Sequence, residues 1–323
     1  MPSPFADPFA SDLDFDAAAA QLWDYQRAQN PIVRRFCELL GTESPTFMPI
    51  SFFKEHDFRT GGDWTPEIEF QSSGTTGQIP SRHRIREAAL YRKTALRGFR
   101  QFYGPGNWSI FALLPHYLER GHSSLVWMVK TWMEDFGNLG SDFYLHDRDR
   151  LRRALQSAAK SGDRILLIGV TYALLDLAEE GKLDLPDNAV VMETGGMKGR
   201  RKEMIRAELH TILRDGLGVG AIHSEYGMTE LLSQAYLTPE PGATYARFRC
   251  PPWMRVTITD PYLPGRVLPT GQTGRINVTD LANRHSCAFI RTDDLGRAFP
   301  DGSFEVLGRL DHAEMRGCNL MYS

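Results

Sequence analysis

Short apolar runs of strand length recur through the middle of the chain, and each is followed by a turn and a stretch of helical spacing. The clearest runs are residues 109–114 (SIFALL), 164–170 (RILLIGV) and 189–192 (AVVM). Runs of this kind are typical of parallel strands that are buried on both faces. Strands that alternate with helices therefore predict an α/β core with a largely parallel sheet.

The chain before these runs adds two helices and one strand to the prediction. Residues 12–30 have the pattern of a helix, and Pro31 marks its end. Residues 67–70 alternate polar and apolar side chains, as a strand does. A second helix is expected from Ile85 to about Tyr103.

The pattern changes after Leu237, where Pro and Gly become frequent and short alternating segments replace the apolar runs. These segments predict antiparallel strands at residues 254–259, 275–279, 288–291 and 304–307. We therefore expect an α/β core over residues 1–240 and a β-rich, barrel-like subdomain over residues 241–308. The length of 323 residues agrees with two domains of ordinary size.

Composition and charge exclude several classes of protein. The chain has 37 Lys and Arg against 40 Asp and Glu, a balance that argues against binding nucleic acid or an anionic membrane through bulk charge. No apolar run reaches the roughly 18 residues of a membrane span, and the acidic N-terminus is unlike a secretory signal. The four cysteines lie far apart, which argues against a disulfide framework or a structural zinc site. We expect a soluble, cytoplasmic protein.

A loop rich in hydroxyl groups follows the predicted strand at residues 67–70. Its sequence, residues 72–77, is Ser-Ser-Gly-Thr-Thr-Gly. The hydroxyl and backbone N–H groups of such a loop suit a phosphate, and its glycines permit close approach. The loop is not a Walker A motif, because Gly77 is not followed by Lys and Ser or Thr. A flexible polar turn is the alternative, since short motifs often match by chance.

A second candidate segment is residues 225–230 (EYGMTE), placed after a strand expected at residues 219–223. Tyr226 suits stacking on a base, Thr229 suits a phosphate, and Glu230 is a hard oxygen ligand for Mg²⁺. The alternative makes Thr229 the cap of a helix and Glu230 an acid in its first turn.

Two further segments are weaker when each is taken alone. Residues 291–296 (RTDDLG) contain a carboxylate that could accept both hydroxyls of a ribose, although sequences rich in Asp are common in turns. Residues 308–311 (GRLD) contain Arg309, which suits a phosphate or a sugar. A surface turn is the alternative for this last segment.

Together and in this order, the four segments resemble the adenylate-forming superfamily of acyl- and aryl-CoA synthetases, peptide-synthetase adenylation domains and luciferases. The motifs of that superfamily are SSGTTG, YGxTE, TGDL and GRxD, matched here at residues 72–77, 226–230, 292–295 and 308–311. Within the superfamily, the chain most resembles LuxE-type acyl-protein synthetases, and after them phenylacetate-CoA ligases. The supporting segments are residues 114–120, 193–199 and 316–319. The resemblance covers Phe70 to the C-terminus and implies a large α/β domain with a small antiparallel β subdomain.

The resemblance implies that a carboxylic acid attacks the α-phosphate of ATP, giving an acyl-adenylate and pyrophosphate. The binding residues that it implies are Ser72, Ser73, Gly74, Thr75, Thr76 and Gly77 for the β- and γ-phosphates, Arg82 for added positive charge, Gly195 and Gly196 beside adenine and the acyl group, Tyr226 with Gly227 for adenine, Thr229 for the α-phosphate, Glu230 for Mg²⁺, Asp294 for the ribose and Arg309 at a hinge. The catalytic residues that it implies are Thr229, Glu230, Arg309 and Cys318.

The chain departs from the larger members of the superfamily at three places. Their phosphate loop ends in Pro-Lys, where this chain offers Arg82, and Thr292-Asp293-Asp294 replaces Thr-Gly-Asp. Either aspartate could hold the ribose, and the alignment favours Asp294. The larger enzymes also continue into a C-terminal domain with a catalytic lysine. We expect that domain to be absent, with residues 309–323 as a hinge-like tail, because LuxE-type relatives are short.

The acceptor of the acyl group has one candidate within the chain. In LuxE-type enzymes a cysteine near the C-terminus takes the acyl group as a thioester, and Cys318 is in the matching region. The alternative is a packed apolar position, as in phenylacetate-type ligases.

The sequence thus predicts an ATP- and Mg²⁺-dependent ligase that activates a carboxylic acid, expected to be a fatty acid. The acyl group is expected to pass to a thiol of a protein or carrier protein. One alternative is an aryl- or acyl-CoA ligase, in which CoA is the acceptor. The other is a non-catalytic protein that binds a nucleotide or an acyl-adenylate.

Overall fold

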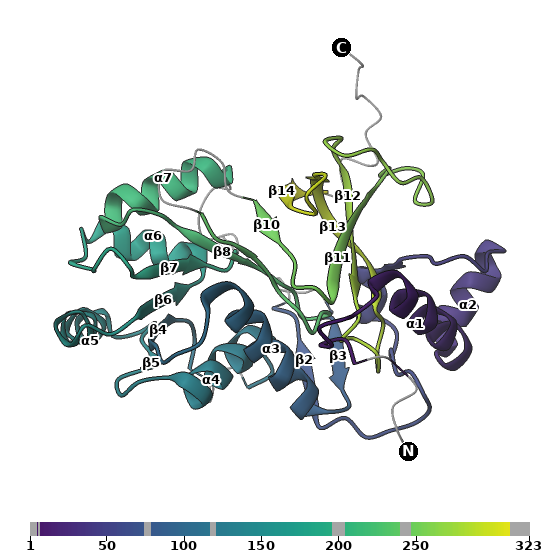
Figure 1. Ribbon diagram of the computed structural model, residues 1–323, viewed down its shortest axis with the longest axis horizontal. Coiled ribbons are helices and arrows are strands. Elements are labelled where there is room, and N and C mark those ends of the chain that lie inside the picture. Colours follow the sequence, from purple (N-terminus) through teal and green to yellow (C-terminus); the bar gives the residue numbers. More distant parts are fainter. Residues whose placement is uncertain are drawn as a thin grey trace, which may run out of the picture.

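The computed structural model describes residue 5 and residues 7–73, 79–116, 121–195, 204–239 and 247–310. Of the predicted site residues, Gly74, Thr75, Thr76, Gly77, Gly196 and Cys318 lie outside the described residues. The described chain forms a long sheet with helices packed on it (Figure 1).

Three of the parallel strands lie at the predicted apolar runs, and β8 (His223–Tyr226) is the fourth. In spatial order the four are β4 (Ser109–Leu113), β6 (Ile165–Gly169), β7 (Val190–Glu193) and β8, with the short β5 (Asp142–Phe143) beside β4. Every residue of β4, β6 and β7 is buried, because helices cover both faces. Figure 1 shows α6 (Thr171–Glu179) and α7 (Arg206–Leu217) on one side, and α3 (Ala88–Tyr103) and α4 (Ser124–Phe136) on the other. Helix α5 (Arg148–Ser161) packs beside β4 and β6.

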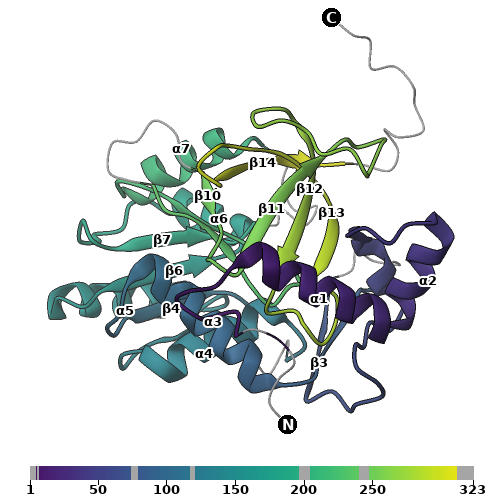
Figure 2. The same ribbon diagram turned by 45° about the vertical axis from the view of Figure 1, so that its right-hand side comes forward.

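The sheet continues past β8 into antiparallel strands, as predicted for the C-terminal part. Their spatial order is β9 (Ala235–Leu237), β10 (Phe248–Arg249), β14 (Phe304–Arg309), β13 (Phe289–Ala298), β12 (Gly274–Asp280) and β11 (Met254–Thr259). Strand β10 joins the two parts, since it pairs with β9 on one edge and with β14 on the other. The core and the β-rich part therefore share one hydrogen-bonded sheet (Figure 2). The domain bounds at residues 240 and 308 stay a prediction.

Two helices precede the sheet, where the sequence analysis predicts one. Helix α1 (Phe15–Gln29) ends as expected, but Pro31 begins a second helix, α2 (Pro31–Leu40). The side chain of Asn30 caps α2 by accepting hydrogen bonds from the N–H groups of Ile32 and Val33. Proline is favourable at the first position of a helix, where its missing N–H is not needed.

A hairpin lies where the sequence analysis begins its second helix. Residues 82–85 form β3 (Arg82–Ile85), which pairs with β2 (Ile68–Gln71), and the helix begins only at Ala88. The prediction was wrong here because His83 and Ile85 are buried on one face of β3 while Arg82 is exposed on the other. The hairpin has a consequence for the site, since it brings together the two ends of the hydroxyl-rich loop.

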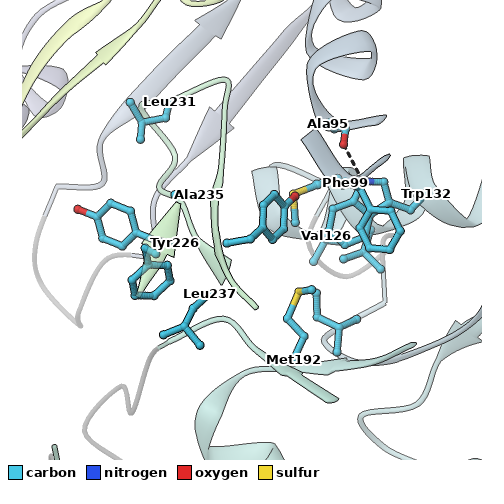
Figure 3. Close-up of a cluster of buried hydrophobic side chains, with 14 of the residues drawn as sticks. Ala95, Phe99, Val126, Trp132, Met192, Tyr226, Leu231, Ala235 and Leu237 are labelled. Atoms are coloured by element: carbon cyan, nitrogen blue, oxygen red, sulfur yellow. Dashed lines mark hydrogen bonds between the residues drawn. The ribbon is translucent and has the colours of Figure 1, made fainter. Parts of the chain in front are cut away.

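Figure 3 shows the buried side chains that fix α3 and α4 beside the sheet. The indole N–H of Trp132 on α4 donates to the carbonyl oxygen of Ala95 on α3 at 3.1 Å. The ring of Phe99 lies 4.7 Å from that of Trp132. Burying one side chain of this size contributes about 1.5–3 kcal/mol. The packing of α3 against α4 therefore fixes the position of both helices relative to the sheet.

None of the described helices is both long enough and apolar enough to cross a membrane.

Candidate active site

A cleft of about 1000 Å³ opens at one edge of the parallel sheet. Leu114, Val170, Thr194 and Gly227 line it, and each directly follows the last residue of β4, β6, β7 or β8. Ligands of open α/β sheets bind outside the carboxyl ends of the strands. The cleft therefore lies where the fold itself predicts a binding site.

Most of the described residues that the sequence analysis selects line this one cleft. They are Ser72, Ser73, Gly195, Tyr226, Gly227, Thr229, Glu230, Asp294 and Arg309. Arg82 is not among the lining residues, because β3 turns it to the exposed face, opposite His83. Its role as a phosphate ligand stays a prediction.

The loop that carries Thr229 and Glu230 is held by two buried side chains from elsewhere in the chain. His83 contacts the carbonyl oxygen of Thr229 at 2.8 Å, and the amide of Asn283 donates to the carbonyl oxygen of Glu230 at 2.8 Å. His83 also contacts Oδ1 of Asn283 at 3.2 Å. Burial lowers the pKa of His83 to about 4, although the hydrogen bonds with Thr229 and Asn283 raise that pKa. No helix begins at Thr229 within the described residues, so the alternative that makes it a helix cap is wrong. The strand before the motif is also later than predicted, since β8 includes Tyr226.

The Glu230 side chain is buried at the wall of the cleft, with 4 % of the residue exposed. Burial raises the pKa of its carboxyl, while a hydrogen bond with Ser81 and the charges of Arg309 and Lys54 lower it. A carboxylate in this position gains from a cation, because burial without one disfavours its ionised form.

Tyr226, Asp294 and Arg309 form a connected group across β8, β13 and β14. The Tyr226 hydroxyl donates to Oδ2 of Asp294 at 2.7 Å, and Nε of Arg309 lies 3.4 Å from Oδ1 of the same carboxylate. The Tyr226 ring packs against the stacked rings of Phe248 and Phe304, with ring centroids 5.7 and 5.5 Å away. Its aromatic body is thus fixed at the cleft wall.

The neighbouring acid, Asp293, has a different partner. It forms an ion pair with the buried Arg275, whose Nε donates to the carbonyl oxygen of Thr292 at 2.6 Å. The segment is part of β13 rather than the turn that its composition favours. Both aspartates border the cleft, but Asp293 pairs with a buried arginine, whereas Arg309, the cationic partner of Asp294, is largely exposed.

Hydrogen bonds between Ser72 and Ser81 join the two ends of the hydroxyl-rich loop at the cleft. The N–H of Ser72 donates to the carbonyl oxygen of Ser81 at 3.0 Å, and the N–H of Ser81 donates to Oγ of Ser72 at 2.9 Å. Ser72, Ser73 and Ser81 all face the cleft. Residues 74–78 between them are outside the described ranges.

Two cations that the sequence analysis missed also line the cleft, Lys54 and Arg206. Lys54 ends a short 3₁₀ helix, η1 (Ile50–Lys54), which follows β1 (Met48–Pro49) next to β13. Arg206 begins α7, and its guanidinium lies 4.6 Å from the ring centroid of Phe248. No motif surrounds either residue in the sequence, so only the fold reveals them.

The turn that bears Gly195 depends on a buried carboxylate, Glu193. Its Oε2 accepts from the N–H of Gly195 at 2.7 Å, and Oε1 lies 3.5 Å from Nε of Arg206 and 3.7 Å from Nε2 of His210. Burial raises the pKa of Glu193, but the contacts of His210 and Arg206 outweigh it and bring the pKa to about 2. Gly195 has a φ of 70°, which favours glycine.

Replacing Glu193 by glutamine should therefore lower the free energy of unfolding by about 2–3 kcal/mol, because it breaks a buried ion pair but keeps the acceptor for Gly195. Urea denaturation at pH 7 measures the change. Glu208→Gln, an exposed acid in the first turn of the same helix as Arg206, is the matched control and should cost about 0.5 kcal/mol or less. A loss of the same size in both variants would contradict the role given to Glu193.

The donor set of the cleft fits a Mg²⁺ ion that is shared with a nucleotide. No group of three or more His, Cys, Asp and Glu side chains that could hold a metal occurs in the described ranges. Mg²⁺ in nucleotide sites is typically bound by one or two carboxylates, with the substrate phosphates and water completing its shell. Glu230 offers one such carboxylate next to the loop assigned to the phosphates.

Comparison with known proteins agrees with this geometry. A family model described as "Acyl-protein synthetase, LuxE" matches residues 131–323. The solved structures that resemble the chain include an amide bond synthetase, McbA from Marinactinospora thermotolerans (TM-score 0.51, 19 % identity, 76 % of this chain and 49 % of that one). ATP-bound MatB from Rhodopseudomonas palustris matches with a TM-score of 0.52 and 18 % identity over 78 % of this chain and 50 % of that one.

A third structure matches over most of the chain. An open conformation of 2-hydroxyisobutyryl-CoA ligase, in complex with 2-HIB-AMP and CoA, has a TM-score of 0.65 and 15 % identity over 95 % of this chain and 77 % of that one. At these identities the likeness establishes the fold. The chain spans about half the length of the first solved structures that it matches. No curated protein sequence matches it.

Proposed function

Because the chain belongs to the LuxE family of acyl-protein synthetases and has the fold of the adenylate-forming ligases, we propose that it activates a carboxylic acid with ATP and passes the acyl group to a thiol. The observation that carries the proposal is the convergence of four separated segments on one cleft at the carboxyl edge of the parallel sheet. In this proposal one carboxylate oxygen of the acid attacks the α-phosphorus of ATP. The bond from that phosphorus to the β-bridging oxygen breaks, and pyrophosphate leaves.

Each group around the cleft has a distinct task in this reaction. Ser72 and Ser73 donate to the β- and γ-phosphates, and Thr229 donates to the α-phosphate. Asp294 accepts the ribose hydroxyls, since each carboxylate oxygen can accept more than one hydrogen bond. The cations Lys54, Arg206 and Arg309 offset the charge of the phosphates. Little covalent work remains for the protein, because positioning and charge stabilisation dominate phosphoryl-type transfer.

Glu230 holds Mg²⁺ in the proposal. The ion would neutralise charge on the phosphates when bound. The chain's contribution is to fix that carboxylate, through the contacts of His83 and Asn283 with the loop backbone.

The second half of the reaction transfers the acyl group to a thiol, whose sulfur attacks the acyl carbonyl carbon and releases AMP. Cys318 is one proposed acceptor within the chain, and a carrier protein or CoA are the others. That the acid is a fatty acid stays a prediction.

Acid-dependent ATP–pyrophosphate exchange tests the first half-reaction. We expect exchange with at least one acid of a panel that spans fatty, aryl and amino-bearing acids. A folded protein that binds ATP but supports no exchange with any of them would favour the non-catalytic binding protein instead.

The acceptor is settled with the same panel and a radiolabelled form of the active acid. Label that stays on the protein, is released by hydroxylamine and is absent from Cys318→Ser assigns the thioester to Cys318. Label retained by Cys318→Ser would rule that cysteine out, and consumption of free thiol on addition of CoA would identify a CoA ligase.

A further inference from the structure

Two buried polar side chains with unused hydrogen-bonding capacity border the cleft beside Gly227. Glu225, on β8, is 9 % exposed, and Gln234, just before β9, is 5 % exposed. Both line the cleft. Polar groups this deeply buried normally form a hydrogen bond with a partner. Unused hydrogen-bonding capacity at such groups therefore needs an explanation.

Gln234 has one free acceptor. Its side-chain N–H donates to the carbonyl oxygen of Leu232 at 3.2 Å, which identifies Oε1 as the remaining atom. That Oε1 is buried and has no hydrogen-bond partner among the described residues. Only a group that donates a hydrogen bond can satisfy it.

Glu225 offers a carboxyl group next to that acceptor. No described residue makes a hydrogen bond or an ion pair with it. The two side chains are neighbours across Gly227, because a Cβ at that position would overlap Oε1 of Glu225 and lie 3.1 Å from Cγ of Gln234. Glycine at position 227 thus leaves the space that the Glu225 carboxyl occupies.

Among the described residues, none places a positive charge against the Glu225 carboxyl. Burial, and then the charge of Glu193, raises the pKa of Glu225 to about 8. The charge of Glu225 in turn adds to burial in raising the pKa of the Tyr91 and Tyr103 hydroxyls. A buried carboxylate without a cation is costly, so a positively charged ligand group would be stabilised here.

We propose that Glu225 and Gln234 bind a basic nitrogen of the acid substrate, which makes the enzyme selective for carboxylic acids that carry an amino group. The inference rests on the proposed function, because it treats this part of the cleft as the pocket for the acid. The ammonium N–H groups donate to the Glu225 carboxylate and to Oε1 of Gln234. Val126 and Met128 of α4, which also line the cleft, cover the apolar part of the substrate.

Binding of paired acyl-adenylate analogues tests this inference without requiring catalysis. The probes are acyl-sulfamoyl adenosines made from 3-phenylpropanoic acid and from phenylalanine, which differ only in the amino group, and from octanoic acid and 8-aminooctanoic acid. In calorimetric titrations of the full chain, we expect at least one amino-bearing analogue to bind at least about tenfold more tightly than its partner, as for a hydrogen bond to a charged group.

Glu225→Gln should remove most of that preference, and Gln234→Leu should reduce it less. The wild type should also release a proton on binding near pH 7, seen as heat that depends on the buffer, because the ammonium ionises a carboxyl that is protonated beforehand. Glu225→Gln should release none. If Glu225→Gln does not fold, Gln234→Leu provides the same comparison.

The outcomes separate this inference from the proposed function. Equal affinity for both members of each pair in the wild type would overturn the inference and leave adenylate formation intact. A preference that survives both Glu225→Gln and Gln234→Leu would also overturn it. If no analogue binds, the proposed function fails and this inference fails with it.

Discussion

Replacing Glu230 by glutamine should reduce acid-dependent ATP–pyrophosphate exchange about 10³-fold, which corresponds to about 4 kcal/mol of transition-state stabilisation. The substitution keeps the shape of the side chain but removes the charge that is proposed to hold Mg²⁺. The loop itself should keep its position, since His83 and Asn283 bind its backbone and not the Glu230 side chain.

Stability separates this role from a structural one. Burial raises the pKa of Glu230 in the folded protein above its ordinary value, so at pH 7 its ionisation opposes folding and the neutral amide relieves that cost. The melting temperature of Glu230→Gln should therefore be unchanged or higher. Glu55→Gln, an exposed acid next to Lys54, is the matched control and should keep full activity. A destabilised Glu230→Gln with normal exchange would contradict the assignment.

The parallel strands could be predicted because burial on both faces leaves an unbroken apolar run, as in residues 165–169. The predicted helix boundaries were wrong where a residue is compatible with two kinds of local structure. Pro31 ends one helix and begins another, and only the cap made by Asn30 distinguishes the two. Only two residues separate Arg82–Ile85 from α3, and the pairing of this strand with β2 could not be deduced from local propensity.

The residues of the candidate site also fall into two groups, those that the sequence could indicate and those that it could not. Residues that stand in a motif, such as Thr229 and Asp294, could be selected from the sequence. Residues that depend on distant contacts could not, because the chain gives no sign that His83 will meet Thr229 from 146 positions away. Lys54 likewise reaches the cleft only because β1 pairs with β13.

Glu225 lies between these two cases. It stands directly before the Tyr226 motif, and an acid in a buried strand is itself a signal that could have been used. What the sequence does not supply is that the described residues around it include no cation, which depends on how α3, β7 and β9 pack against β8.

Substituting the two adjacent aspartates of β13 should give opposite results. Asp294→Asn should raise the KM for ATP in the exchange reaction by about 30–100-fold, because it weakens charged hydrogen bonds to the ribose hydroxyls. Its stability should change little, because the amide oxygen of asparagine can still accept from the Tyr226 hydroxyl, and the lost ionic partner, Arg309, is largely exposed and contributes little.

Asp293→Asn should leave the KM for ATP within about twofold of wild type but lower the free energy of unfolding by about 2–3 kcal/mol, because it leaves the buried Arg275 without its anionic partner. Exchange kinetics and urea denaturation on the same two proteins measure both quantities. The two substitutions are chemically identical and lie at adjacent positions. A difference between them therefore reports the different partners of Asp293 and Asp294. A rise in KM for Asp293→Asn instead would assign the ribose to Asp293 and contradict the choice made from the Tyr226 and Arg275 contacts.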